Sequence, residues 1–177
     1  NNLVLDDSER GIFRVNRSAF TEQYILDEER DRIFNQCWLY ACHESELAEP
    51  NSFLARKIAG KPIVLTRNQD GEIQAFLNSC PHRGNLVCRE KSGKGKLLRC
   101  FYHSWAFDLE GALVSVPGPE AYRDGWNKEE MGLTAVPRIA SYRGLIFICH
   151  NKNVEPLESY LGCLLYTSDA ADEVVGG

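Results

Sequence analysis

Two short motifs, each joining a cysteine to a nearby histidine, restrict the folds open to this sequence. In the first motif one residue separates Cys80 from His82, and in the second two residues separate Cys100 from His103. Seventeen residues, 83–99, lie between the two motifs. At this spacing a thiol and an imidazole can meet at a metal from a loop, without a helix to align them. The chain must therefore hold two loops together on a rigid scaffold.

The sequence around the motifs predicts such a scaffold from short antiparallel strands. Brief alternating runs of apolar and polar residues are separated by turn signals, such as Asn68–Gly71, whose glycine supplies a positive φ. Each motif follows a predicted strand, so both loops can leave one end of a mainly β, antiparallel sandwich or barrel. The predicted strands span 52–58, 62–67, 72–77, 96–99, 106–109, 112–116, 136–139 and 144–149. The last is nearly all apolar, which predicts a central position in its sheet.

The segments outside these strands predict helices and loops. An extended arm leads to a helix over Leu26–Phe34, with Asp27 as its N-cap and acidic residues in its first turn. A short helix is also expected within 153–162, after a proline. The basic run 89–96, between the motifs, predicts a solvated turn that can also help to receive an acidic partner protein. The adjacent pair Cys42–His43 is expected to be strand content.

Composition excludes several classes of function. The 177 residues carry 20 Lys+Arg against 25 Asp+Glu, a net charge of −5, which gives no electrostatic case for binding nucleic acid or an anionic membrane. No apolar run reaches the roughly 20 residues that span a bilayer, and no secretory signal is visible. Seven cysteines, an odd number without a signal, argue against a disulfide framework and for a reducing compartment such as the cytoplasm.

The two motifs leave two kinds of metal centre open. Tetrahedral zinc sites usually pair ligands as Cys-x(2–4)-Cys and His-x(3–5)-His. A [2Fe–2S] cluster in which two histidines replace two cysteines on one iron needs one cysteine and one histidine from each of two loops. The mixed pairs of this sequence fit the second arrangement better, and zinc is the main competing chemistry.

At this point the chain resembles a known family. Motif 80–84 and motif 100–105 look like the Rieske domain of the large (α) subunit of bacterial aromatic-ring-hydroxylating oxygenases. The resemblance continues through Phe107–Gly111, Val116–Pro117 and Tyr142–Phe147, and it covers about residues 13–162. It implies an antiparallel Rieske β-sandwich with an inserted two-loop cluster-binding subdomain, preceded by a short N-terminal helix.

The resemblance also implies a ligand set. Cys80 and Cys100 would hold one iron of a Rieske [2Fe–2S] cluster, and His82 and His103 would hold the other. These four residues are both the cofactor-binding and the metal-binding residues, and no catalytic residue is expected in this chain. Residues expected to surround the ligands are Arg83, Gly84, Tyr102 and Trp105.

The motifs depart from related patterns at three positions. Ser104 stands where the family commonly has glycine, so this residue could strain its loop. Respiratory-type Rieske proteins link their two loops by a disulfide, and the positions expected to hold it are Asn85 and Tyr102 here. That bridge cannot form, which disfavours the respiratory type.

The resemblance implies a role in a larger enzyme. In the family a reductase, often with a ferredoxin, passes electrons from NAD(P)H to the Rieske cluster, which feeds a mononuclear Fe(II) that activates O₂. The second Rieske histidine, here His103, contacts an Asp of the neighbouring subunit on the way to that iron. Only His43 and His150 remain as further histidines, too few for a triad. We therefore expect an electron-transfer fragment of a dioxygenase or monooxygenase that does not turn over alone, from a homo-oligomer of α subunits with or without β subunits.

The expected organisation has four parts. Residues 1–36 form the N-terminal arm and helix, 37–152 the Rieske domain, and 153–162 the start of a link to an absent catalytic domain. Residues 163–177 resemble a translated sequencing adaptor and are expected to be foreign. A free-standing Rieske ferredoxin is an alternative, although the arm and helix are hard to explain on that reading. A zinc-stabilised Cys2His2 interaction domain is the other.

Overall fold

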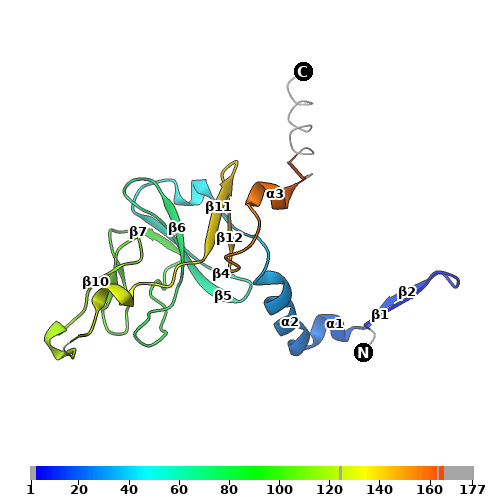
Figure 1. Ribbon diagram of the computed structural model, residues 1–177, viewed down its shortest axis with the longest axis horizontal. Coiled ribbons are helices and arrows are strands. Elements are labelled where there is room, and N and C mark those ends of the chain that lie inside the picture. Colours follow the sequence, from blue (N-terminus) through cyan, green and yellow to red (C-terminus); the bar gives the residue numbers. More distant parts are fainter. Residues whose placement is uncertain (1–2, 124, 163, 166–177) are drawn as a thin grey trace, which may run out of the picture.

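A computed structural model of the protein describes residues 3–123, 125–162 and 164–165. The fold is mainly antiparallel β, as the sequence predicts, with a β-body from which an N-terminal arm projects (Figure 1). The strands are β1 Val4–Asp7, β2 Ile12–Val15, β3 Leu39–His43, β4 Ser52–Ile58, β5 Lys61–Arg67, β6 Ile73–Leu77, β7 Ser92–Lys94, β8 Leu98–Arg99, β9 Ala106–Phe107, β10 Leu113–Ser115, β11 Arg138–Tyr142 and β12 Leu145–Cys149. The helices are α1 Ser18–Thr21, α2 Gln23–Glu29 and α3 Leu157–Leu161, with a π-helical turn η1 Arg30–Phe34 and 3₁₀ turns η2 Glu44–Leu47, η3 Pro119–Ala121 and η4 Lys128–Met131.

Three sheets build the β-body. The largest has the order β6-β5-β4-β7, a second has the order β11-β12-β3, and a small one has the order β10-β9-β8. Strand β12 lies between β11 and β3, so the prediction that the apolar run near 144–149 is central is confirmed. The predicted strand 52–58 coincides with β4, and the other predicted strands agree with β5, β6 and β8–β12 to within a few residues.

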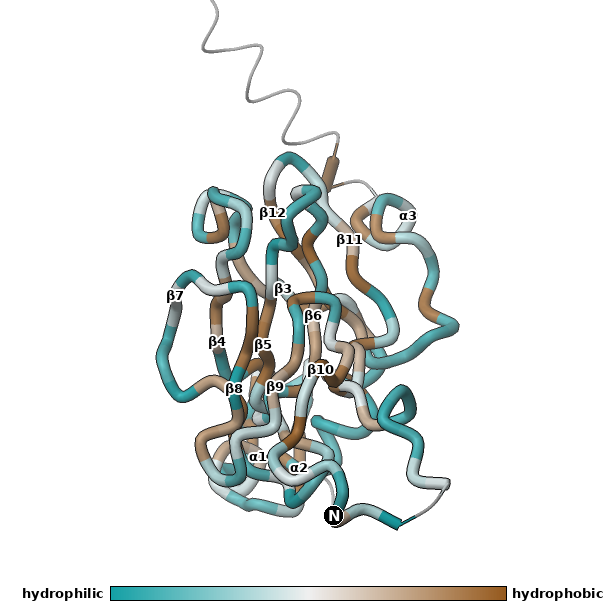
Figure 2. Tube along the Cα trace, turned by 90° about the vertical axis from the view of Figure 1, so that its left-hand side faces the viewer, coloured by the Kyte–Doolittle hydropathy of each residue, from teal (hydrophilic) through white to brown (hydrophobic). Residues whose placement is uncertain are grey.

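The central strand β5 separates two hydrophobic cores. Its side chains at 63, 64 and 65 are all buried, and successive residues of a strand point to opposite faces. Ile63 and Leu65 pack with Ile146 and Ile148 of β12, which fills the space between the two larger sheets. Val64 packs instead with residues of the small sheet and of both motifs. Brown, hydrophobic stretches accordingly run along the inner strands of Figure 2, with hydrophilic connections outside them.

The predicted hairpin turn at 68–71 is confirmed. The Asn68 side-chain oxygen accepts hydrogen bonds from the backbone N–H groups of Asp70 (3.1 Å) and Glu72 (2.8 Å). Gly71 has a φ of +88°, a conformation that glycine adopts without strain. This turn fixes the register in which Arg67 pairs with Ile73 across β5 and β6.

The start of the first helix differs from the prediction. Helix α2 begins at Gln23, because Glu22 before it is extended, with φ −86° and ψ 125°. Asp27 is therefore not an N-cap and lies inside the helix. Its carboxylate accepts hydrogen bonds from Gln23 Nε2 and Arg30 Nη1, both at 2.9 Å. These contacts form because residues three or four positions apart lie on the same face of a helix.

The two segments predicted to be irregular contain further strands. Within the predicted arm, β1 and β2 form a hairpin in which Val4 pairs with Val15. In the basic run 89–96, residues 92–94 form the edge strand β7, which pairs with β4, so a turn throughout that run is wrong. A Cβ at Gly93 would lie 2.8 Å from the Phe53 ring, so a larger residue there would have to displace that ring.

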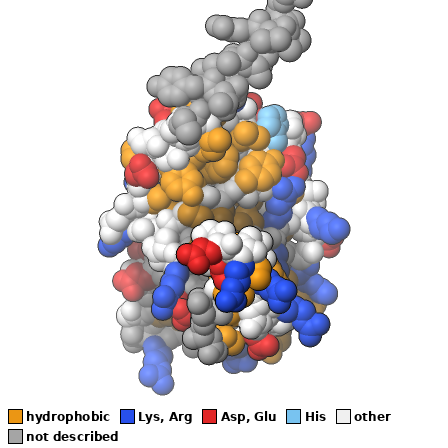
Figure 3. All heavy atoms as spheres, turned by 90° about the vertical axis from the view of Figure 1, so that its right-hand side faces the viewer, with side chains coloured by type: hydrophobic (Ala, Val, Ile, Leu, Met, Phe, Trp, Pro, Cys, Tyr) orange, Lys and Arg blue, Asp and Glu red, His pale blue; other side chains and the backbone are white. Residues whose placement is uncertain are grey.

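The C-terminal segment packs on the outer face of the sheet β11-β12-β3. The predicted helix within 153–162 is present as α3, whose Leu157 is buried beside Trp38. Trp38 Nε1 donates to the Glu155 carbonyl at 2.9 Å. Figure 3 shows a hydrophobic patch on this side of the molecule, above a band of charged side chains.

The predictions for the C-terminal tail and for membrane spans stand as follows in the structure. The predicted foreign tail 163–177 lies outside the described residues, apart from Leu164 and Leu165. Over the part of the chain that the structure describes, no helix combines the length and apolarity that a membrane crossing needs.

Candidate metal centre

The first motif is a tight loop that follows strand β6. The Cys80 carbonyl accepts a hydrogen bond from the Gly84 N–H at 2.8 Å, and the Cys80 N–H donates to the Asn85 carbonyl at 2.8 Å. Gly84 has a φ of +70°, which lets the chain turn back on itself here. The loop therefore holds its cysteine in a small closed ring of backbone hydrogen bonds.

The second motif, after strand β8, closes in the same way. The Cys100 carbonyl accepts from the Ser104 N–H at 2.9 Å, and the Cys100 N–H donates to the Trp105 carbonyl at 2.8 Å. Ser104, the position where the sequence departs from glycine, has a φ of +56°. This serine thus has the same left-handed conformation as Gly84, and strain at Ser104 is expected because its Cβ crowds the backbone.

A buried amide, Asn78, ties the ends of the first loop together. Its Nδ2 donates to the Cys88 carbonyl at 2.7 Å, and its Oδ1 accepts from the N–H groups of Val87 (3.0 Å) and Cys88 (2.8 Å). Asn78 is buried, so these bonds replace water at all three backbone groups. Sequence reasoning missed this residue, because an asparagine shortly before a loop also suits an ordinary exposed turn.

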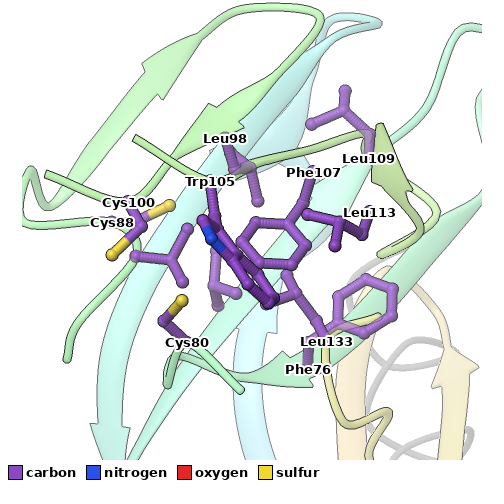
Figure 4. Close-up of a cluster of buried hydrophobic side chains, with 12 residues drawn as sticks. Phe76, Cys80, Cys88, Leu98, Cys100, Trp105, Phe107, Leu109, Leu113 and Leu133 are labelled. Carbon is purple, nitrogen blue, oxygen red and sulfur yellow. The ribbon is translucent and has the colours of Figure 1, made fainter. Parts of the chain in front are cut away.

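The two cysteine side chains meet at the edge of the core between the loops. Both Cys80 and Cys100 are 2% exposed and belong to the same buried cluster as Trp105 (Figure 4). Burial raises the pKa of the Cys80 thiol, the backbone N–H of His82 lowers it, and a hydrogen bond with the Cys100 side chain raises it. The N–H of Arg83 also lowers this pKa, so the first loop aims two donors at the Cys80 sulfur.

The two histidine side chains of the motifs lie next to each other. The ring centroids of His82 and His103 are 4.7 Å apart, and the planes cross at 68°. Desolvation by burial lowers the pKa of His82, and the charges of His103 and Arg83 lower it further. His82 is therefore held in the neutral form, which has the free nitrogen lone pair that a metal ligand needs.

This donor set fits a two-iron cluster. The loops bring together a pair of thiols and a pair of imidazoles, the division that a Rieske cluster makes between its two irons. A single zinc ion would need all four groups at one point. Among the residues with described positions, no three Cys, His, Asp or Glu side chains form a group that could hold one metal ion.

Aromatic side chains border both imidazoles. The indole of Trp105 stacks on His82, with centroids 4.9 Å apart and planes 4° from parallel. The Tyr102 ring contacts His103 at 3.8 Å between centroids, but this tyrosine is 53% exposed. Of the residues predicted to surround the ligands, Trp105 thus packs inside, Tyr102 lies at the surface, and Arg83 is exposed.

The remaining cysteines and histidines have other surroundings. Cys42 is buried in β3, and burial raises its pKa to about 11. Cys88 belongs to the same core as the motif cysteines, and burial raises its pKa to about 12. His43 accepts a hydrogen bond from the Ser45 N–H at the start of η2. Burial lowers the pKa of His150, whose Nε2 is buried without a hydrogen-bond partner.

Comparison with known proteins agrees with this geometry. The Rieske [2Fe-2S] domain family matches residues 37–142. The chain is 39% identical over 163 residues to the toluate 1,2-dioxygenase subunit alpha of Pseudomonas putida, covering 90% of this chain and 36% of that protein. It is 36% identical over 170 residues to the methanesulfonate monooxygenase hydroxylase subunit alpha of Methylosulfonomonas methylovora, covering 88% of this chain and 41% of that protein.

A solved structure supports the same relationship at the level of the fold. The naphthalene 1,2-dioxygenase from a Rhodococcus species, bound to indole, superimposes with a TM-score of 0.81 at 37% identity, over 88% of this chain and 36% of that one. The chain spans little more than a third of the length of the relatives it matches first. The chain belongs to the Rieske [2Fe-2S] domain family, and its relatives are α subunits of Rieske oxygenases.

Proposed function

We propose that Cys80 and Cys100 bind one iron of the [2Fe–2S] cluster and that His82 and His103 bind the other. The observation that carries this assignment is that two loops with equivalent backbone closure bring their two thiols next to each other and their two imidazoles next to each other. When bound, a Rieske cluster supplies one-electron transfer.

The protein's own groups prepare this site in three ways. Burial excludes water from the two sulfurs, and backbone N–H groups aimed at Cys80 stabilise its thiolate. Desolvation keeps His82 neutral and ready to ligate. The two imidazoles are only partly buried, so the site reaches the protein surface on its nitrogen side.

The relatives support a place for this chain in a longer protein. It would be the electron-transfer part of an oxygenase α subunit, which accepts electrons originating from NAD(P)H through a ferredoxin or a reductase. It would deliver them to a mononuclear Fe(II) held by a catalytic domain in the rest of the protein. The dioxygenase and monooxygenase names of the relatives support oxidation of a substrate with O₂, and the toluate and naphthalene names support an aromatic one.

The four-part organisation completes the proposal. Residues 37–152 would form the cluster domain, after the arm 1–36 and before the link 153–162, with 163–177 foreign. The intact protein would be an oligomer of α subunits, with or without β subunits, in the cytoplasm. The six cysteines of the described residues that are free of disulfides suit such a reducing compartment.

The surface beside the second loop suits a partner of opposite charge. A hollow of about 350 Å³ there is lined by apolar side chains, including Phe101, and by three charged residues. The charged residues are Arg89, Arg99 and the acidic Glu90, so arginines outnumber acids in the lining. The Arg89 guanidinium lies 4.5 Å from the centre of the Phe101 ring. Because complementary charge steers encounter, an acidic ferredoxin would be guided to this side of the site.

The assignment is tested by reconstituting the purified 177-residue chain with iron and sulfide under anaerobic conditions. We expect about two irons per chain, visible absorption, and a reversible one-electron reduction that yields the EPR signal of a mixed sulfur–nitrogen cluster. A colourless chain that takes up one zinc and shows no reversible reduction would support the zinc-stabilised domain instead.

A matched pair of cysteine variants identifies the ligands. Cys80→Ala should abolish cluster binding, because one iron loses a thiolate. Cys88→Ala removes a buried thiol from the same core and should leave the EPR signal unchanged. Equal loss in both variants would attribute the effect to packing and would contradict the ligand assignment.

A further inference from the structure

The connection between β10 and β11 reaches the first histidine through a column of aromatic rings. The connection contains the 3₁₀ turns η3 and η4. Two of its residues, Tyr122 and Trp126, pack against the core that contains both motif cysteines. They lie more than 35 residues after His82 in the chain, and the fold brings them back to it.

The column begins with a face-to-face contact. The indole of Trp105 lies parallel to the His82 imidazole, with an interplanar angle of 4° and centroids 4.9 Å apart. Trp105 is only 2% exposed, so the indole cannot move aside into solvent. One face of the His82 ring is therefore covered, and rotation of this ring about its bond to Cβ would collide with the indole.

The next two rings hold the indole in place. Trp105 Nε1 donates to the Tyr122 hydroxyl at 3.1 Å. Tyr122 stacks on Trp126 at 4.2 Å between centroids, and Trp126 also meets Trp105 edge-on at 6.0 Å. Aromatic pairs at such distances prefer these stacked and edge-on geometries. Three rings thus support one another behind a single imidazole.

Among the described residues, the second imidazole has no such column of rings behind it. His103 touches Tyr102, whose ring is more than half exposed and can move in solvent. The two histidines of the site are therefore held differently, although their loops close in the same way.

We propose that Trp105, Tyr122 and Trp126 are positioning residues that fix the orientation of the His82 imidazole. The β10–β11 connection would in this way set the geometry of one nitrogen ligand and, through it, the electronic properties of the centre. This inference rests on the proposed function of His82 as a ligand. Groups outside the ligand shell that orient ligating histidines are a general means of tuning metal sites.

The test compares variants of the column with a matched control. Trp126→Leu removes a supporting ring, Trp126→Phe keeps an aromatic ring, and Tyr122→Phe removes only the hydroxyl that accepts from Trp105. Tyr160→Phe removes a hydroxyl from a half-exposed tyrosine of α3 and serves as the control. Circular dichroism would establish that each variant is folded.

The first readout needs no cluster. In the apo protein, NMR should show His82 ring protons shifted by the ring current of the stacked indole. Trp126→Leu should move these signals toward their values in an unstructured peptide, Trp126→Phe should largely restore them, and Tyr160→Phe should leave them unchanged. Unchanged His82 signals in folded Trp126→Leu would overturn the proposal.

The second readout uses the reconstituted protein. Trp126→Leu should release iron to a chelator about tenfold faster than the parent chain, the lower end of the effects seen for groups that orient ligands. The g-values of its reduced state should also change, and Tyr122→Phe should have a smaller effect, about twofold. Identical g-values and release rates in all column variants would also overturn the proposal, whereas failure of the parent chain to bind a cluster would refute the proposed function alone.

Discussion

The two motif loops have the same backbone closure but obtain their rigidity from different sources. In each loop the carbonyl of the cysteine accepts from the N–H four residues later, and that residue is left-handed. The first loop has glycine at this position and is tied at its ends by Asn78. The second has Ser104 and carries Trp105, the base of the aromatic column. Equivalent geometry therefore does not imply equivalent tolerance to substitution.

The largest expected effect breaks the support of the first loop. Asn78→Ala removes three hydrogen bonds and leaves buried backbone groups of Val87 and Cys88 unpaired. At about 1 kcal/mol for each bond, the free energy of unfolding should fall by about 3 kcal/mol. Urea denaturation of the apo protein measures it.

The control for this variant is Asn16→Ala, which removes an exposed asparagine that accepts one hydrogen bond from Ser18. It should cost no more than about 1 kcal/mol. Equal losses of unfolding free energy in Asn78→Ala and Asn16→Ala would show that the Asn78 hydrogen bonds do not specifically stabilise the first loop.

A reciprocal pair of substitutions tests the left-handed position of each loop. Gly84→Ser should destabilise the protein by about 1–2 kcal/mol, because a Cβ is crowded at positive φ. Ser104→Gly should relieve similar crowding and so stabilise the folded state. Part of this gain is offset because glycine also gives the unfolded chain more conformational freedom. Thermal unfolding of the two variants and of Gly84→Ser/Ser104→Gly together measures both effects. Changes of the same sign in the two single variants would contradict the equivalence of the loops.

The smallest expected effect concerns pH. The pKa of His82 is lowered from its ordinary value of 6.5, so the unfolded state binds more protons than the folded state just below that value. The contribution of His82 to apo-protein stability should therefore be complete above pH 6.5 and decrease as the pH falls below it. NMR titration measures the pKa directly. In His103→Ala, which removes one cause of the shift, it should rise toward 6.5, and no rise would contradict the coupling of the two loops through their histidines.

Much of the fold was accessible to sequence reasoning because it depends on local patterns. Alternating polarity predicted β4 to the residue, and the Asn68–Gly71 turn predicted the pairing of β5 with β6. The pairing of cysteines with histidines, together with a family resemblance, indicated the Rieske domain that the comparisons confirm.

The features that sequence reasoning did not predict depend mostly on contacts with distant parts of the chain. The polar run 89–96 contains strand β7 because β4 offers an edge to it. The roles of Asn78 and Tyr122 depend on partners brought close only by folding, and neither residue stands out in the sequence. The start of α2 was misplaced because the extended backbone at Glu22, rather than a capping side chain, sets it.

The unequal depth of the four candidate ligands has a practical consequence. Cys80 and Cys100 are almost inaccessible, whereas His82 and His103 reach the surface. Acid and chelating agents would therefore attack the nitrogen end first, and damage to a loaded centre would begin there while the sulfur end stays shielded. The cluster-loaded protein would therefore last longest under conditions that protect the two imidazoles from acid and chelators.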